Sequence, residues 1–142
     1  MVEIISSRGE HIKVDTDEAG RVTCVSIKQD NEEVKLVRYR YDEQGNMIET
    51  IDALNVSKYF FYKENHLLIR LVNQGGMSFH WEYEGNGENA RCIHTWGDGG
   101  VMEYYIHYGK GTTVSVMAKM LSLNISMALT NLSIKLSMPM AE

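Results

Sequence analysis

Apolar and polar residues alternate along most of this chain. Alternation over about four to eight residues is typical of a β-strand that has one side more buried than the other. Short strands are therefore predicted throughout residues 2–29 and 34–84. The clearest apolar positions share one face of their segments and are Val37, Tyr39 and Tyr41, then Phe60 and Tyr62, then Phe79, Trp81 and Tyr83.

Turn residues interrupt this alternation and predict tight hairpins. Gly20 and Gly45 each follow an acidic residue by three positions and can adopt the positive φ that closes a short hairpin. Asn65 is expected to take the same conformation in its turn, since Asn tolerates it better than most residues do. Further turns are predicted at residues 7–10 and 30–31, and a longer loop at 85–89.

One short unit recurs along the chain. Tyr41 is followed by Tyr62 and Tyr83, each 21 residues further on, and by Tyr108 after a longer gap. A fixed period of this size indicates that one structural unit has been copied several times. The aligned rings are predicted to form an aromatic row across the sheet, in which each cross-strand pair contributes roughly 0.2–1 kcal/mol. The predicted core is this stacked aromatic row, in which Tyr41, Tyr62 and Tyr83 are expected to point the same way, together with their aromatic neighbours Tyr39, Phe60 and Trp81.

The hairpins and the repeat together predict an all-β fold. We expect an antiparallel meander, with about one hairpin per repeat. A sheet of ten or more strands twists strongly, so an open arc or a partial barrel is expected.

The repeat resembles a known family. Residues 39–47 read Tyr-Arg-Tyr-Asp-Glu-Gln-Gly-Asn-Met and resemble the YD repeat, tyrosine-aspartate and then glycine, of Rhs-type proteins. Residues 15–23 look like a second copy of its turn, and residues 90–100 are similar to a segment of bacterial Rhs proteins. The resemblance covers residues 12–116. The structural repeat positions that it implies are Gly20, Tyr41, Asp42, Gly45, Tyr62, Tyr83 and Tyr108.

The resemblance also implies a context for the chain. In Rhs-type proteins such repeats wind into a shell that encloses a C-terminal toxin, in secretion and contact-dependent competition systems. This chain has too few copies to close a shell. It is therefore expected to be a piece of the wall, and its parent protein is expected to be secreted or at the cell surface.

The last part of the chain departs from the repeat. We divide the sequence into a repeat region, residues 1–116, and a divergent tail, residues 117–142. Period-two alternation in the tail predicts a hairpin rather than a helix. The abrupt change of composition suggests a reading-frame shift near residue 117, which would make the chain a truncated product of a longer gene. The alternating tail residues are Leu121, Leu123, Ile125, Met127 and Leu129, then Leu132, Ile134, Leu136 and Met138.

Composition and charge narrow the possible partners. The chain has 142 residues, enough for one domain, and a net charge of −5 without a basic cluster. A nucleic-acid surface needs clustered Lys and Arg, so no nucleic-acid partner is expected. No apolar run approaches the roughly 20 residues of a membrane span, and the N-terminus has no signal-peptide core. Cys24 and Cys92 could pair, but we expect free buried thiols.

Candidate chemistry is sparse in this sequence. The segment from Asp15 to Gly20 lacks the later acidic ligands of a calcium-binding EF-hand loop. The five histidines lack the local pairs of zinc sites, although His80 and His94 could meet across neighbouring strands. We therefore predict no catalytic residue, no metal and no cofactor, and hence no enzyme.

Two functions remain open at this stage. The first is a non-catalytic scaffold, which would associate with itself or with a larger Rhs-type protein, because a short arc leaves edges and an apolar face open. Either a dimer or packing of the tail hairpin over that face is expected. The alternative is a carbohydrate- or protein-binding module at the cell surface that uses Trp81, Trp96 and Asp98. Buried tryptophans would favour the scaffold.

Overall fold

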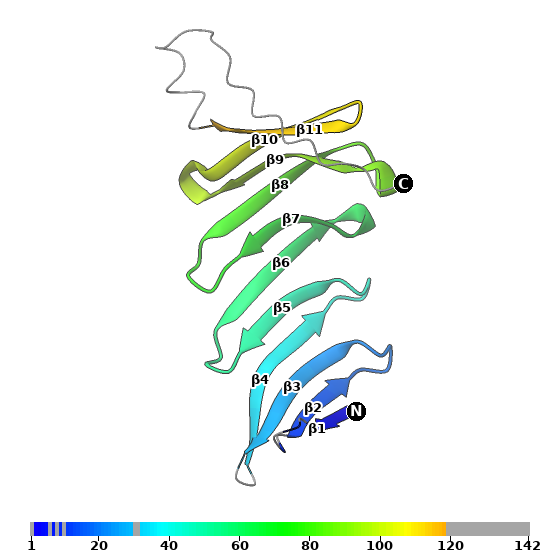
Figure 1. The fold of residues 1–142 in the computed structure, drawn as a ribbon, viewed down its shortest axis with the longest axis vertical. Coiled ribbons are helices and arrows are strands. Elements are labelled where there is room, and N and C mark those ends of the chain that lie inside the picture. The colour runs from blue at the N-terminus through cyan, green and yellow to red at the C-terminus, as the bar shows by residue number, and fades with distance from the viewer. Residues whose placement is uncertain (1, 6, 8, 10, 30–31, 119–142) are drawn as a thin grey trace. The chain divides into compact units, whose positions relative to one another are not determined.

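The computed structural model describes residues 2–5, 7, 9, 11–29 and 32–118. The regular elements in this part of the chain are eleven β-strands and three single-turn 3₁₀ helices. Strands that pair are antiparallel and follow each other in chain order, so the predicted all-β meander of hairpins is confirmed (Figure 1). The chain divides into two compact units, Met1–Gly76 and Met77–Glu142, a boundary that the sequence did not indicate.

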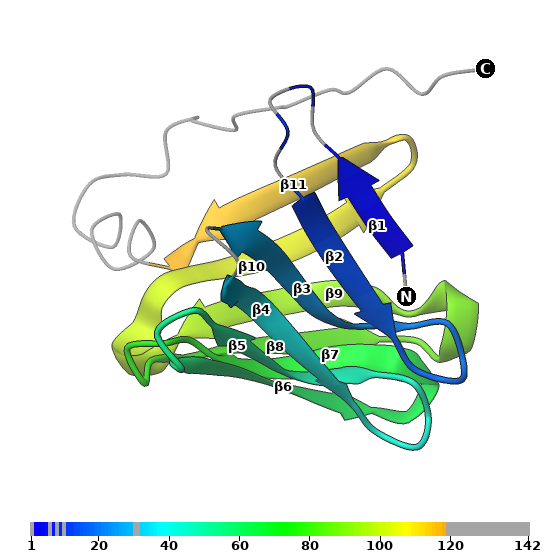
Figure 2. The same ribbon diagram turned by 90° about the horizontal axis from the view of Figure 1, so that it is seen from below.

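Unit 1 is a single-layer sheet in which each strand pairs with the next (Figures 1 and 2). Among its described residues, the first and last strands do not pair with each other, so the sheet of this unit is open. A short 3₁₀ turn, η1 (Glu64–His66), precedes the last strand. The strands are β1 (Val2–Ile5), β2 (His11–Thr16), β3 (Val22–Gln29), β4 (Glu32–Tyr41), β5 (Met47–Asp52), β6 (Ser57–Lys63) and β7 (Leu67–Val72).

Unit 2 continues the same pattern of antiparallel pairing. Its strands are β8 (Ser78–Glu84), β9 (Arg91–Gly97), β10 (Val101–Gly109) and β11 (Thr112–Met117), with η2 (Gly87–Asn89) and η3 (Asp98–Gly100) between them. Strand β11 includes residue 117, where the divergent tail was predicted to begin. The tail hairpin predicted over residues 121–138 and the turn predicted at 30–31 lie outside the described residues.

One five-residue turn recurs in unit 1, and its bonds explain the Asp-x-x-Gly spacing. In the turn that begins at Asp42, the Asp42 N–H donates to the Asn46 carbonyl at 2.9 Å. The Gly45 N–H donates back to the Asp42 carbonyl at 3.1 Å, and the positive φ of 88° at Gly45 then turns Asn46 back toward Asp42. One carboxylate oxygen of Asp42 then accepts the Asn46 N–H at 2.8 Å. Aspartate therefore begins this turn because its side chain bonds the main chain four residues on.

The same turn occurs at more places than the sequence indicated. Asp17 and Asp52 accept main-chain N–H bonds in the same way. The corresponding left-handed residues are Gly20 (φ 80°) and Asn55 (φ 61°). The turns at Asp52 and at 73–76 were not predicted, although both carry the spacing of Asp or Asn followed three residues later by Asn or Gly. At Asn65 the expected positive φ is confirmed at 62°.

Fewer apolar side chains are buried than the predicted aromatic core would require. Among the described residues, the buried apolar side chains are Cys24 and Ile51 alone. The rings of Tyr39, Phe60 and Trp81 are only half-buried. The prediction that the aromatic row forms a buried core is therefore wrong, because within the described residues of each unit no second layer covers these rings. Both cysteines are free, as expected, but only Cys24 is fully buried.

Candidate functional site

A tyrosine hydroxyl ties consecutive hairpins together at three places. Tyr41 donates to the Val22 carbonyl at 2.8 Å, so β4 is tied to the start of β3. Tyr62 donates to the Met47 carbonyl at 3.0 Å, from β6 to β5. In unit 2, Tyr108 donates to the Cys92 carbonyl at 2.8 Å, from β10 to β9. Tyrosines that recur in the sequence thus make the same bond in the structure.

The three acceptor carbonyls share a position in their hairpins. Val22, Met47 and Cys92 each stand at a register shift, where they pair with Thr16, Tyr41 and Tyr83. A β-bulge leaves one residue without its ladder partner. The tyrosine of the following copy supplies a donor at that irregular point. The bond therefore joins the bulge of one hairpin to the last part of the next.

An arginine covers the tyrosine ring at two of these places. Arg21 and Arg91 each directly precede an acceptor residue. The Arg21 guanidinium lies 4.7 Å from the Tyr41 ring centroid, and that of Arg91 lies 5.1 Å from the Tyr108 ring. Arg21 is itself held by Asp17, whose carboxylate is 2.7 Å from its Nε atom. A cation above a ring adds roughly 0.5–1 kcal/mol at exposed sites.

The hydrogen bonds of the turns also shift the pKa values of the aspartates beside these tyrosines. The main-chain N–H of Arg21 holds the pKa of Asp17 below its usual value of 3.8. The Asn46 side-chain amide does the same for the pKa of Asp42. Burial, and secondly the charge of Asp42, raises the pKa of Tyr62 above 10.0. The aspartates therefore remain acceptors, and Tyr62 remains a donor, at neutral pH.

Strand register in unit 1 places aliphatic side chains in rows on one face. Residues directly opposite each other in paired strands project to the same side of a sheet. Two such rows run across β1 to β4, and none of their eight side chains is buried. We call these eight positions the aliphatic face. The rows are Val2, Val14, Val25 and Val37, and Ile4, Ile12, Ile27 and Val34.

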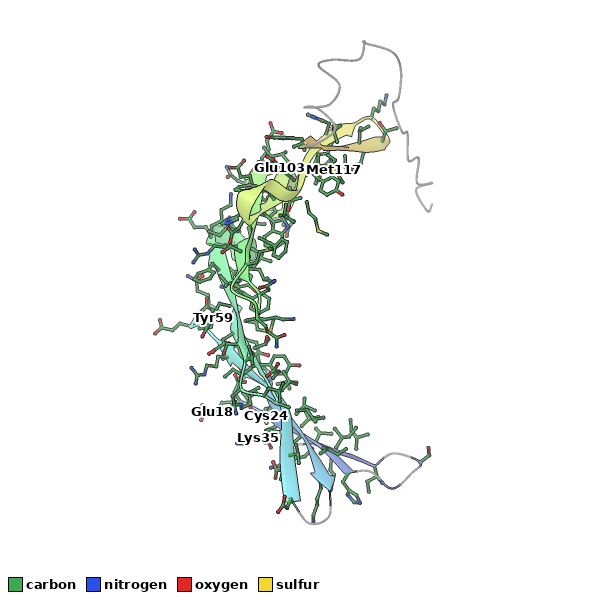
Figure 3. All side chains as sticks on the ribbon, turned by 90° about the vertical axis from the view of Figure 1, so that its left-hand side faces the viewer. Glu18, Cys24, Lys35, Tyr59, Glu103 and Met117 are labelled. Carbon is green, nitrogen blue, oxygen red and sulfur yellow. The ribbon has the colours of Figure 1, made fainter. Side chains whose placement is uncertain are left out.

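The other side of the same strands is charged. His11 Nδ1 lies 2.9 Å from Glu3, and Lys13 lies 3.3 Å from Glu33 across the sheet. The fully buried Ser26 donates to Glu33 at 2.9 Å, and this bond is the main cause that lowers the pKa of Glu33. Figure 3 shows Lys35 and Tyr59, which project from this charged face. Unit 1 thus has one aliphatic face and one mainly charged face, which also carries the exposed Ile5, Tyr59 and Phe61.

In unit 2, four rings stack in a row across three strands. The ring centroids of His80 and Trp96 are 5.0 Å apart, those of Trp96 and His94 4.3 Å, and those of His94 and Tyr105 4.2 Å. The planes within each pair differ by 22° or less. We call these four residues the histidine–aromatic stack. Strands β8, β9 and β10 each contribute at least one ring.

Three carboxylates flank the histidine–aromatic stack. His94 lies between Glu82 (3.3 Å) and Glu103 (3.0 Å), and its side chain is 15% exposed. Asp98 lies 3.5 Å from His80. The Ser78 main-chain N–H, and then His80, lowers the pKa of Asp98.

Glu103 also accepts the Tyr105 hydroxyl at 3.2 Å, which raises the pKa of Tyr105. One carboxylate thus contacts two members of the stack, since Glu103 faces both His94 and Tyr105.

The structure brings two of the three predicted binding residues together. Trp96 and Asp98 both contact His80. Trp81 pairs with Thr95, the neighbour of Trp96, so it projects from the opposite face of the sheet. Both tryptophans are half-buried. The sequence missed Glu82 and Glu103, although each alternates in phase with a ring of the stack on its own strand.

Other candidate features of the described residues are modest. An open depression of about 300 Å³ lies beside the β4–β5 turn and is lined by residues that include Asp42, Asn46 and Tyr62. The Asp42 oxygens there are already bonded to Asn46. Within the described part of the chain, no group of three or more His, Cys, Asp or Glu residues could hold a metal ion. No helix among the described residues is long and apolar enough to cross a membrane.

Comparison with known proteins adds no family to these observations. No protein-family model matches the sequence, and no curated protein matches it either. The resemblance to Rhs-type proteins therefore rests on the residues of the repeat itself.

Proposed function

We propose that this chain is a non-catalytic scaffold, a run of copied hairpins that forms part of the wall of a larger protein assembly. The observation that carries the proposal is the contrast between the two faces of unit 1. One face has cross-strand ion pairs, such as Lys13 with Glu33, that suit contact with water. The other has eight aliphatic side chains, of which Val2, Ile4 and Val34 are 55%, 51% and 41% exposed.

Such a face is costly to leave in water. Burying one Val or Ile side chain contributes about 1.5–3 kcal/mol. Contiguous apolar patches on soluble proteins generally mark a surface that contacts another macromolecule. A sheet with one charged, solvent-facing side and one apolar side is expected in a wall whose inner side contacts another protein surface.

The tyrosine bonds support the same role. They join neighbouring strands at three places, β3 to β4 and β5 to β6 in unit 1 and β9 to β10 in unit 2, so they act on the continuity of each sheet rather than on a ligand. A residue whose hydroxyl bonds a main-chain carbonyl at a bulge is placed for stability. The repeat of Tyr41, Tyr62 and Tyr108 in this position favours a structural use of the whole segment.

We extend the proposal to the family context. The chain would be a fragment of an Rhs-type repeat protein, from a secreted or cell-surface toxin system. The support is the match of residues 39–47 to the YD repeat, together with the recurrent roles of its tyrosine and aspartate. Gene neighbours would test this context, because a long Rhs-type gene or a secretion cluster beside this one is expected.

Binding of the dye ANS tests the wall proposal directly. ANS fluoresces on exposed apolar surface, so the dilute chain should bind it. Ile27→Lys should lower the signal, because it places a charge in the middle of the aliphatic face. Tyr59→Lys is the matched control, since Tyr59 is 45% exposed on the charged face. A signal that does not respond to Ile27→Lys would contradict the proposal.

A binding module remains the second candidate, supported by the histidine–aromatic stack. Aromatic rings with nearby carboxylates are a common lining of ligand sites. Here the rings of Trp96 and His94 already contact each other, and the carboxylates face histidines, which favours a structural use. Tryptophan fluorescence during titration with glycans separates the two functions. A response that Trp96→Phe removes and Trp81→Phe keeps would favour binding.

A further inference from the structure

We infer that the aliphatic face of unit 1 packs against the same face of a second copy of this chain, so that two single-layer sheets form a face-to-face sandwich. This inference rests on the proposed function and names the partner that covers the inner side of the wall. It commits to a second copy rather than to another protein or to residues 119–142.

The chemistry of the face suits sheet-on-sheet packing. The two aliphatic rows consist only of Val and Ile, and register pairs the members of each row across β1 to β4, with one shift between the rows where β3 meets β4. Side chains from the inner faces of two packed sheets interdigitate at a sheet separation of about 10 Å. Branched aliphatic side chains in regular rows are the residues that fill such a layer.

Three charged residues lie on the same side of unit 1 as the aliphatic face but are not part of it. Register places Glu32 beyond Val34 at the end of β4, Asp52 opposite Val37 on β5, and Lys58 on β6. An apolar centre with a charged rim is the usual anatomy of a protein–protein interface. The centre has no charges that would repel a second copy, and a two-fold axis would bring the same face of both copies together.

The aliphatic face and the adjoining side of β5 to β7 together match the size of a stable dimer interface. Seven strands at a spacing of about 4.8 Å, with about six residues each at roughly 3.3 Å per residue, cover about 700 Å². A standard interface buries about 800 Å² on each partner. Beyond the aliphatic rows, the same side of unit 1 continues with Tyr39 and with the paired residues Phe60 and Leu71. One copy can therefore cover the aliphatic face of the other.

Sedimentation equilibrium of the full chain tests this inference. The wild type should reach twice the monomer mass as concentration rises, and its ANS signal should fall over the same range. Ile27→Lys should weaken the dimer by roughly a hundredfold or more, because it buries an unpaired charge in the interface. Tyr59→Lys should leave the dissociation constant unchanged, since it alters the charged face. Far-UV circular dichroism establishes that each variant keeps its strands.

A second variant keeps the test decisive if Ile27→Lys does not fold. Ile4 is 51% exposed on the edge strand β1, so Ile4→Lys should weaken the dimer without disturbing a central strand. A wild type that remains a monomer at all concentrations would overturn the inference. So would a dimer that both lysine variants on the aliphatic face leave intact. If the chain is monomeric but its ANS signal still depends on Ile27, self-association fails while the wall proposal stands.

Discussion

The hydroxyl of Tyr62 donates a 3.0 Å hydrogen bond to the main-chain carbonyl of Met47, the residue at which the β4–β5 hairpin changes register. Tyr62 belongs to the next hairpin along the chain. The bond thus converts a local irregularity of one copy into an attachment point for the following copy. The same relation holds between Tyr41 and Val22.

Removing this hydroxyl should weaken the sheet. Tyr62→Phe keeps the ring and deletes the donor, so the free energy of unfolding should fall by about 0.5–1.5 kcal/mol. Urea denaturation followed by circular dichroism measures the change. Tyr59→Phe is the control on the same strand, because Tyr59 is exposed on the charged face. An equal fall in the free energy of unfolding of the two variants would show that the hydrogen bond to Met47 does not stabilise the sheet.

Acid should loosen the turns through their aspartates. The pKa values of Asp17 and Asp42 are both held below 3.8 by hydrogen bonds that the carboxylates accept. A carboxyl whose pKa is lower in the folded state stabilises the fold above its unfolded pKa, and this contribution is lost as pH falls through the folded pKa. The melting temperature should therefore drop below about pH 4.

Substitution at the turn should remove part of this acid dependence. In Asp42→Asn, the slope of melting temperature against pH should be shallower below about pH 4, because one of the titrating acceptors is gone. Glu43→Gln serves as the control, since it removes a neighbouring carboxylate that is exposed in the same turn. An acid transition that is identical in the wild type and in Asp42→Asn would count against the role of the turn carboxylate.

Alanine substitutions at the adjacent glycines Gly75 and Gly76 distinguish the effect of backbone conformation from the effect of side-chain crowding. Gly76 has a φ of 81° with open space where a β-carbon would lie, whereas Gly75 has no positive φ. Gly76→Ala should cost about 1–2 kcal/mol, because an L-residue is strained in the left-handed region. Gly75→Ala should be close to neutral. Thermal melting of both variants gives the comparison, and equal destabilisation would contradict the assignment of Gly76 to the left-handed position.

Much of the backbone was predictable from local signals. Alternation located the strands around Tyr41 and Tyr62, and Asp-x-x-Gly located the turns at Gly20 and Gly45. These features depend on residues close together in sequence, where main-chain sterics and side-chain bonds act directly. Asn65 was also predictable, because Asn tolerates a positive φ, whereas the positive φ of His66 in the same turn was not expected.

The arrangement across strands was not predictable in the same way. Whether Trp81 and Trp96 share a face depends on which residue of β9 lies opposite Trp81, and that residue is Thr95. A bulge shifts this register by one residue, and no feature of the sequence around Cys92 predicts that bulge. The prediction of an aromatic core was wrong for a related reason. Alternation shows that a strand has two different faces, but it does not show whether a second layer covers either face.

The carboxylates beside the histidine–aromatic stack give the last prediction. Glu103 accepts the Tyr105 hydroxyl at 3.2 Å, and this bond is the main cause that raises the pKa of Tyr105 above 10.0. Glu103→Gln should therefore lower the pKa of Tyr105 toward 10.0, because a neutral amide no longer repels the phenolate. NMR titration of the Tyr105 ring at alkaline pH measures the shift. Glu82→Gln should change this pKa less, since the charge of Glu82 is the weakest of the causes that raise it. An equal response to both substitutions would mean that general surface charge, and not the Glu103 contact, sets the ionisation of the stack.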